Sequence, residues 1–153
     1  HYNIYYIKMF TKYDYSKYHT DSLVTVLFGT KPVDDEDFQD FLNKWLLLYD
    51  LKKDFTFIFN CENVHLVPIK YCIKMSLFIR SLKRKEYQYL KKSIIYIPNK
   101  TAKRLLDFIF MIQPPVAPVF IINDLSFIDD ILAGKTPDDI EIIYPSKSYL
   151  DLF

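Results

Sequence analysis

The alternation of short apolar runs with helical patterns between Phe55 and Asp124 constrains the fold more than any other feature of this chain. The apolar runs have the length and composition of buried strands, and the segments between them carry apolar residues at helical spacing. Strands that alternate with helices are typical of a parallel sheet with crossover helices. We therefore predict an α/β fold, with strands and helices at Phe55–Phe59, Val67–Tyr87, Ser93–Ile97, Thr101–Gln113 and Val119–Ile122.

The flanking segments extend this pattern. Two further strands, Ile4–Phe10 and Leu23–Phe28, are expected to form a hairpin or an edge strand joined through the polar segment Thr11–Ser22. The predicted sheet is mixed, mainly parallel, and has five or six strands. Its other expected elements are a helix over Asp34–Leu51, a short helix over Leu125–Leu132 closed by Gly134, and an edge strand at Ile140–Tyr144.

Apolar spacing and capping residues predict how the helices sit on the sheet. Acids at Asp34–Asp37 occupy the N-terminal end of the first long helix, where they stabilise the positive end of the helix dipole; this is favoured over a cation site. Thr101 is the expected N-cap of the Thr101–Gln113 helix. The helix over Val67–Tyr87 is expected to present one apolar face to the core, made of Ile69, Cys72, Ile73, Leu77, Ile79 and Leu82.

The length of 153 residues fits a single domain with one core, and no repeat or linker divides residues 1–153. Because the chain begins with His1 rather than Met, a domain excised from a longer protein is one interpretation. Charged residues and prolines interrupt the apolar stretches too early for a membrane span. Two cysteines, Cys61 and Cys72, form no disulfide framework. We expect a cytoplasmic location.

Few residues suggest catalysis or cofactor binding. With only two glycines, the chain has no glycine-rich phosphate loop, because bulky residues keep the backbone away from a phosphate. Cys61 and His65 follow a predicted strand, where open α/β sheets place their sites, and a thiolate nucleophile needs such a base. The spacing of nearby Cys, Glu and His residues matches no zinc pattern. We therefore expect no cofactor, no metal and no enzymatic activity.

Charged residues are segregated along the chain, although its net charge is only +1. More than half of the 20 basic residues lie between Lys70 and Arg104, with Glu86 as the one acid there. Such a surface suits an acidic protein, a phosphorylated lipid or a second copy of the chain; ordinary solvated helix faces are the alternative. Nucleic acid is disfavoured, since the chain is not basic overall and lacks a binding motif. The candidate partner-binding residues are Lys70, Lys74, Arg80, Lys83, Arg84, Lys85, Lys91 and Lys92.

The apolar stretch Phe108–Val119 contains three prolines and is a candidate contact surface for a partner or a lipid. Core packing is the alternative interpretation. The residues proposed for this apolar surface are Phe108, Met111, Pro114, Pro115 and Val116.

The segment Phe55–Asp124 resembles the STAS (anti-sigma-factor antagonist) domain and the related core of CRAL-TRIO lipid-transfer domains. A strand ends in the polar turn Asn60–Asn63, and a helix, a second strand, the turn Pro98-Asn99 and a further helix follow. STAS antagonists carry a phosphorylatable Ser at the start of the first of these helices. Here the matching region, His65–Tyr71, has no Ser, Thr or Gly, so the resemblance does not carry that switch over.

The resemblance implies a non-catalytic module that binds a protein partner, or itself, through this helix and its flanking loops. A CRAL-TRIO-like binder of a lipid or anionic phospholipid is the alternative, and it predicts a ring-lined cavity with a basic mouth. A Cys61/His65-dependent enzyme is the weakest alternative.

Overall fold

The protein is described by a computed structural model over residues 9–148. Its six-stranded sheet has the spatial order β1-β2-β3-β4-β5-β6, with β2 to β5 parallel and the two outer strands antiparallel to their neighbours. This confirms the predicted α/β fold with a mixed, mainly parallel sheet. The strands are β1 (Thr11–Asp14), β2 (Leu23–Phe28), β3 (Phe55–Asn60), β4 (Leu90–Tyr96), β5 (Val119–Ile122) and β6 (Glu141–Ile143). The helices are α2 (Tyr18–Asp21), α3 (Asp35–Asp50), α4 (Ile69–Lys83), α5 (Lys100–Ile112) and α6 (Phe127–Leu132).

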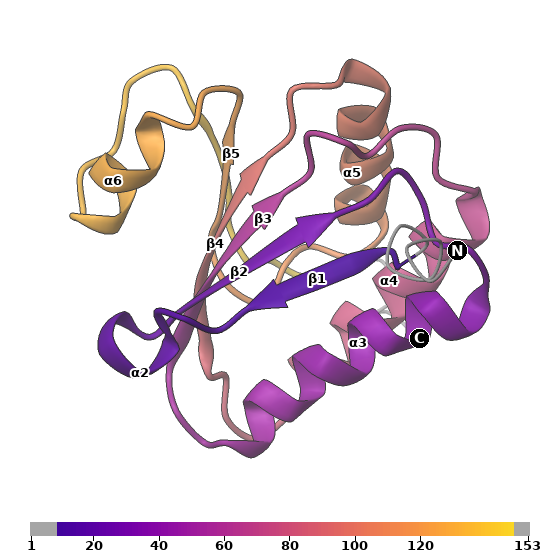
Figure 1. The fold of residues 1–153 in the computed structure, drawn as a ribbon, viewed down its shortest axis with the longest axis horizontal. Coiled ribbons are helices and arrows are strands. Elements are labelled where there is room, and N and C mark those ends of the chain that lie inside the picture. The colour runs from indigo at the N-terminus through magenta and orange to yellow at the C-terminus, as the bar shows by residue number, and fades with distance from the viewer. Residues whose placement is uncertain (1–8, 149–153) are drawn as a thin grey trace, which may run out of the picture.

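The three long helices cover one face of the sheet. Each step from β2 to β5 moves one position in the same direction, so crossovers of one hand place α3, α4 and α5 on the same side (Figure 1). The short α6 lies on the opposite side. Because strand order does not reverse within this parallel block, the block has no topological switch point, where open α/β sheets bind ligands.

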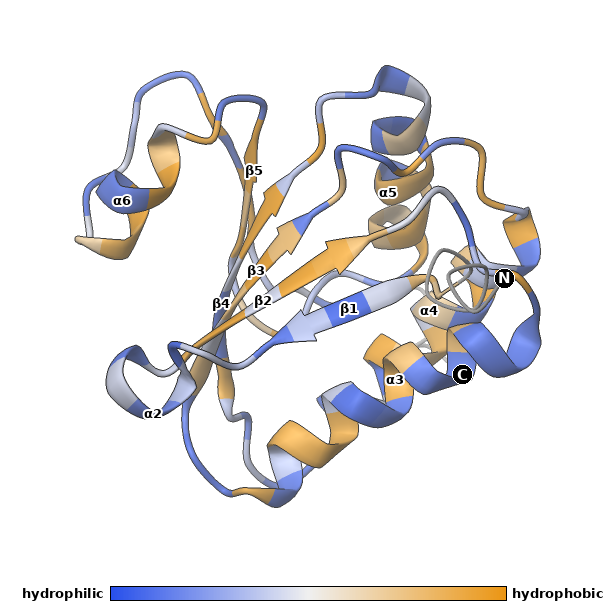
Figure 2. Ribbon diagram, in the orientation of Figure 1, coloured by the Kyte–Doolittle hydropathy of each residue, from blue (hydrophilic) through white to orange (hydrophobic). Residues whose placement is uncertain are grey.

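The main core lies between the sheet and the long helices. Alternate residues of each strand point to this side, and the strands are correspondingly apolar along β2 to β5 (Figure 2). The centre of β3 contributes Phe55, Phe57 and Phe59, whose rings pack on one another and on Trp45 of α3, 4.9 Å from Phe57 between ring centroids. Aromatic side chains therefore fill most of this layer.

The opposite face of the sheet has a smaller apolar cluster under α6. Leu23, Ile58, Ile94 and Ile122 come from four adjacent strands, and Ile131 of α6 packs on them. Towards β1 this face is less covered, because Leu27 at the end of β2 is 42% exposed. The two faces are thus unequally buried.

The first strand lies at a different place in the sequence from the one expected. β1 occupies Thr11–Asp14, inside the segment predicted as a polar connection, and pairs with β2 as an antiparallel edge. Most of the predicted strand Ile4–Phe10 lies outside the described residues. Asp37 of α3 fixes the position of the chain just before β1. Its carboxylate accepts a hydrogen bond from the backbone N–H of Phe10 at 3.0 Å and thereby holds this residue against α3.

The α4 face was predicted only in part. Cys72, Ile79 and Leu82 are buried as expected, but Ile69, Ile73 and Leu77 are exposed. The side of α4 that faces the sheet is centred instead on a row that also includes Tyr71, Ser76 and Phe78. A continuous apolar pattern on a helix does not by itself show which side meets the sheet.

Helix ends follow local capping chemistry. Asn99, not Thr101, caps α5: its side-chain oxygen accepts a hydrogen bond from the N–H of Ala102 at 3.0 Å. Gly134, at φ 84°, follows α6 as predicted, and its N–H donates to the carbonyl of Ile131.

Candidate functional site

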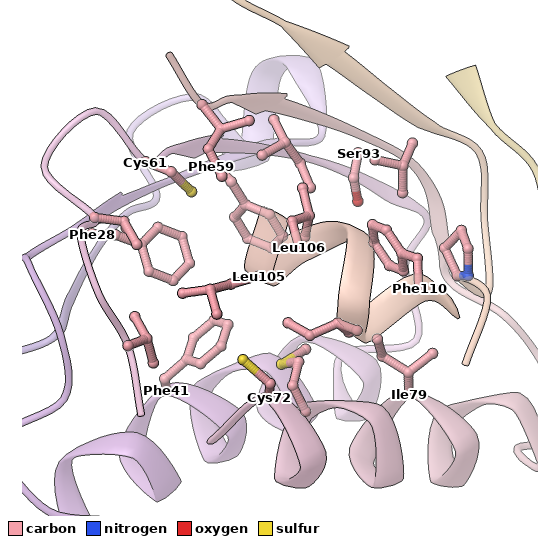
Figure 3. Close-up of a pocket in the computed structure, with 18 of the residues that line it drawn as sticks. Phe28, Phe41, Phe59, Cys61, Cys72, Ile79, Ser93, Leu105, Leu106 and Phe110 are labelled. Carbon is pink, nitrogen blue, oxygen red and sulfur yellow. The ribbon is translucent and has the colours of Figure 1, made fainter. Parts of the chain in front are cut away.

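A largely apolar cavity of about 150 Å³ lies between the sheet and α3, α4 and α5. Rings such as Phe28 of β2 and Phe41 of α3 lie at one end, and Ile79 of α4 and Phe110 of α5 lie at the other (Figure 3). The lining also includes the hydroxyl of Ser93 on β4 and the thiols of Cys61 and Cys72. The cavity is therefore a hydrophobic space with very few polar groups.

Small residues and an incompletely buried helix leave this space open. Ser93 is the small side chain on the core side of β4, between Phe57 and Val119 of the neighbouring strands, and Ala102 is the one fully buried residue of α5. The side chains of Leu105 and Leu106 line the cavity but are only half-buried. The cavity therefore reaches the surface along α5.

An unfilled apolar space is costly for a protein of this size. Voids larger than a water molecule are few in native cores, so the side chains around an apolar space of about 150 Å³ lose packing contacts. Any molecule that fills the space without straining the lining recovers part of that loss, because it binds the folded state alone. The cavity is thus a candidate binding site.

The arrangement around Cys61 does not favour thiol chemistry. Burial raises the pKa of the Cys61 thiol to about 12, so the group is protonated at neutral pH. Its sulfur faces the cavity, whereas His65 lies exposed on the loop that follows β3. Both cysteines are free and buried. The predicted Cys61/His65 pair therefore lacks the activated thiolate that nucleophilic catalysis needs.

A second feature is the outer side of α4 and α5, which we call the α4–α5 surface and define by Ile69, Ile73, Leu77, Phe108, Met111 and Ile112. The two helices pack side by side, with the Ser76 hydroxyl 3.3 Å from the carbonyl oxygen of Ile109. The exposed fractions of Ile69, Leu77 and Met111 are 53%, 51% and 64%. Ile69, Ile73 and Leu77 are spaced every four residues and so form one stripe. Exposed or half-buried large apolar side chains thus lie on two adjacent helices.

The predicted basic residues do not form one patch. Lys70 and Lys74 lie on the α3 side of α4, where both contact the carboxylate of Asp35, at 3.0 and 3.3 Å. The hydrogen bond from Lys70 is the largest cause that lowers the pKa of Asp35 to about 2, and Tyr71 and Lys74 contribute as well. These lysines therefore tie α4 to the start of α3.

Four of the predicted cations gather at the C-terminal end of α4, namely Arg80, Lys83, Arg84 and Lys85. Positive charge at that end is favoured by the helix dipole. Lys83 also donates to the carbonyl oxygen of Ser146 at 3.2 Å, and the ammonium of Lys85 lies 5.9 Å from the ring centre of Tyr49. The basic character of this region is concentrated at one helix end.

The last two cations separate at a bulge in β4. The register with β3 jumps from Leu90 to Lys92, so Lys91 turns outward and lies 3.7 Å from the carboxylate of Asp54. Lys92 points to the opposite face of the sheet, where it donates to the carbonyl oxygen of Ile131 in α6. Neither belongs to the cluster at the end of α4.

The predicted apolar stretch is divided between surface and interior. Met111 is exposed and Phe108 and Pro114 are half-buried, whereas Pro115 is buried and lines the cavity together with Val116. The exposed Ile69, Ile73 and Leu77 were assigned to the core in the sequence analysis. Ser93 was also missed as a site residue; its signal was a small polar side chain within an apolar strand.

Two further features concern residues 9–148 only. There, no three or more His, Cys, Asp or Glu side chains are grouped so that they could bind a metal ion. Over the same range, each helix is too short or too polar to cross a membrane.

Comparisons with known proteins add no relationship: no family model, curated protein or solved structure matches this chain.

Proposed function

We propose that this domain is a non-catalytic protein-binding module that uses the α4–α5 surface. The observation that carries the proposal is the exposure of Ile69, Ile73, Leu77 and Met111 on two neighbouring helices. Scattered exposed apolar residues are normal, but a contiguous group with a polar rim is typical of a protein contact site.

The rim favours a partner with acidic residues. The cations at the end of α4, among them Arg84 and the half-buried Arg80, border the apolar stripe, and Arg104 lies exposed on α5. Charged residues at the edge of an interface mainly guide association and orientation, whereas buried apolar contacts supply the affinity. We infer a partner that presents apolar side chains next to carboxylates.

The resemblance to STAS domains supports the same surface. α4 follows the strand and polar turn that carry the resemblance, so it corresponds to the helix through which STAS domains dock their partners. A second copy of this chain is one such partner, since acids gather at Asp124–Glu141. Two buried free thiols agree with a reducing compartment such as the cytoplasm.

A matched pair of surface variants tests the proposal. Ile73→Glu places a charge in the centre of the α4–α5 surface, at a residue 44% exposed, and Leu47→Glu places one on an exposed apolar residue of α3, at 60%. Glu is a good helix former, so both variants should fold. Tagged wild-type and variant proteins are used to capture partners from extracts of the source cells, with quantification by mass spectrometry.

We expect one partner that wild type and Leu47→Glu capture equally. Ile73→Glu should bind this partner at least tenfold more weakly, which corresponds to about 1.4 kcal/mol of binding free energy. Sedimentation velocity at low and high salt shows whether this partner is a second copy. Equal capture by both variants would exclude the α4–α5 surface as the binding site.

The lipid-binding alternative is supported by one observation, the apolar cavity. Its volume of about 150 Å³ is below the roughly 300–1,000 Å³ of typical ligand pockets. The space therefore suits a smaller molecule than a phospholipid.

A further inference from the structure

We propose that the cavity between the sheet and α5 is a binding site for a small apolar molecule with a single polar group, of the size of phenol. The site is separate from the α4–α5 surface, since it lies on the inner side of the same helices. The proposal is independent of the proposed function: either one can fail alone.

Volume fixes the size of the ligand. An apolar space of about 150 Å³ in another protein core stays dry and takes up benzene, and the cavity here has the same volume. Its walls are mainly rings and branched aliphatic side chains, among them Phe59, Ile95 and Leu106. One aromatic ring or a short alkyl chain fits this space.

Ser93 fixes the chemistry of the polar group. Its side chain is buried on the core side of β4, and Figure 3 shows its hydroxyl on the wall of the cavity. Its backbone N–H donates to the carbonyl of Pro118, but its hydroxyl forms no hydrogen bond with any described residue. A buried hydroxyl without a partner is unfavourable, so a ligand that hydrogen-bonds to it gains affinity and orientation.

The other polar groups near the cavity do not compete for this role. The thiols of Cys61 and Cys72 are weak hydrogen-bonding groups, and burial raises the pKa of both above the usual value. Tyr71 lines the cavity with its ring, while its hydroxyl interacts with Asp35 and Lys70. The cavity therefore selects an uncharged ligand.

Access is available along α5. Leu105, Leu106 and Phe110 line the cavity where it reaches the surface and remain only half-buried, so a small molecule can enter between them. Neither unfolding nor a domain movement is required.

Titrations with phenol and with toluene test the site. The two probes have the same shape, and only phenol carries a hydroxyl. Methyl NMR spectra of the wild-type protein should shift for residues of β4, α4 and α5, with a Kd for phenol of about 1 mM or tighter. Phenol should bind more tightly than toluene by about three- to tenfold, the usual effect of one hydrogen bond.

Three serine variants separate the contributions. Ser93→Ala removes the hydroxyl and should abolish the preference for phenol while toluene still binds. Ser93→Val fills part of the cavity, so both probes should bind at least tenfold more weakly. Ser126→Ala, at an exposed residue next to α6, is the control and should behave as wild type.

Thiol labelling provides a readout that does not depend on the variants. Methyl methanethiosulfonate should modify Cys72 of wild-type protein more slowly at saturating phenol, because the ligand occupies the space next to this thiol. The proposal is overturned if neither probe shifts the cavity methyls or slows labelling, or if Ser93→Ala retains the full preference for phenol.

Discussion

The two faces of the sheet differ in how much structure covers them. On one face, three long helices bury a ring-rich apolar layer that extends from Phe10 to Val119, whereas on the other a six-residue helix, α6, covers a cluster around Ile94. Both faces belong to the same strands and alternate residue by residue. The same sheet therefore has a deep face that stabilises the fold and a shallow face that a short helix protects.

The two faces also differ in the kind of space that they contain. Large rings pack with gaps that aliphatic chains can fill only if they lie close enough, and α5 stays half-buried above them. The shallow face buries branched aliphatic side chains under α6, and beside them a more polar hollow of about 160 Å³ is lined by Leu23, Ile58 and Asp129, among others. The deep face thus combines ring-rich packing with an apolar cavity, whereas the hollow on the shallow face has a largely polar lining.

The largest effect is expected from Phe57→Ala on the deep face. Phe57 is fully buried, and its ring packs on Trp45, Phe55 and Phe59, with centroid distances of 4.6 to 5.0 Å. Truncation should lower the free energy of unfolding by about 3–5 kcal/mol, because it removes apolar contacts and enlarges a space next to the existing cavity. Urea denaturation followed by circular dichroism measures this change; a loss below about 1 kcal/mol would contradict it.

A smaller effect is expected from Ile131→Ala on the shallow face. Ile131 is almost fully buried. Its truncation should lower the free energy of unfolding by at most about 2–3 kcal/mol, near the lower end for such changes, because α6 can adjust. Hydrogen exchange should increase in α6 and β6 while α4 stays protected. Equal acceleration in α4 would show that the two faces unfold as one unit.

The double variant Phe57→Ala/Ile131→Ala sharpens this comparison. The two side chains lie on opposite faces of the sheet, in different clusters. Their effects should therefore add to within about 0.5 kcal/mol.

The smallest effect is expected from Asp35→Asn, at the solvent edge of the deep face. The ion pairs with Lys70 and Lys74 lower the pKa of Asp35 from 3.8 to about 2. A carboxylate whose folded-state pKa is depressed stabilises the fold above its unfolded pKa, and this contribution is lost as the pH falls from 3.8 towards 2. Melting temperatures of wild type and variant should thus differ slightly at pH 6 and converge near pH 2.

Glu36→Gln is the matched control for this pH dependence. Glu36 lies beside Asp35 in the first turn of α3, so both substitutions remove one charge from the same helix end. The pH-dependent difference should be larger for Asp35→Asn. If both variants behave alike, the helix dipole rather than the contact with α4 accounts for it.

The sequence predicted helices and strands well where the apolar pattern lies within one segment. It predicted poorly which side of a helix faces the sheet. The strand at Phe55–Phe59 and the helix ending near Leu51 were predicted within one or two residues, because their signals lie within each segment. The exposed side of α4 was predicted wrongly at Ile73 and Leu77, because apolar residues surround much of that helix. β1 was missed because Thr11–Asp14 is polar and becomes a strand only by pairing with β2.

For the candidate sites, the sequence indicated individual residues but did not show which of them lie next to one another in the fold. It singled out Lys70 and Lys92 together, but the structure places them on different sides of the sheet. Lys70 lies on α4 and contacts α3, whereas a bulge at Lys91 turns Lys92 towards α6. Ser93 becomes a candidate site residue only because the tertiary structure places it on the wall of the cavity under α5.

By itself, the sequence determined the α/β class and the order of its main elements, since strand and helix patterns depend on residues close together in the chain. Only the tertiary structure decided which side of α4 is free, that the basic residues are dispersed, and that a space remains under α5. These properties depend on contacts between segments far apart in the sequence, and such contacts are set by the volumes and shapes of the side chains that meet there.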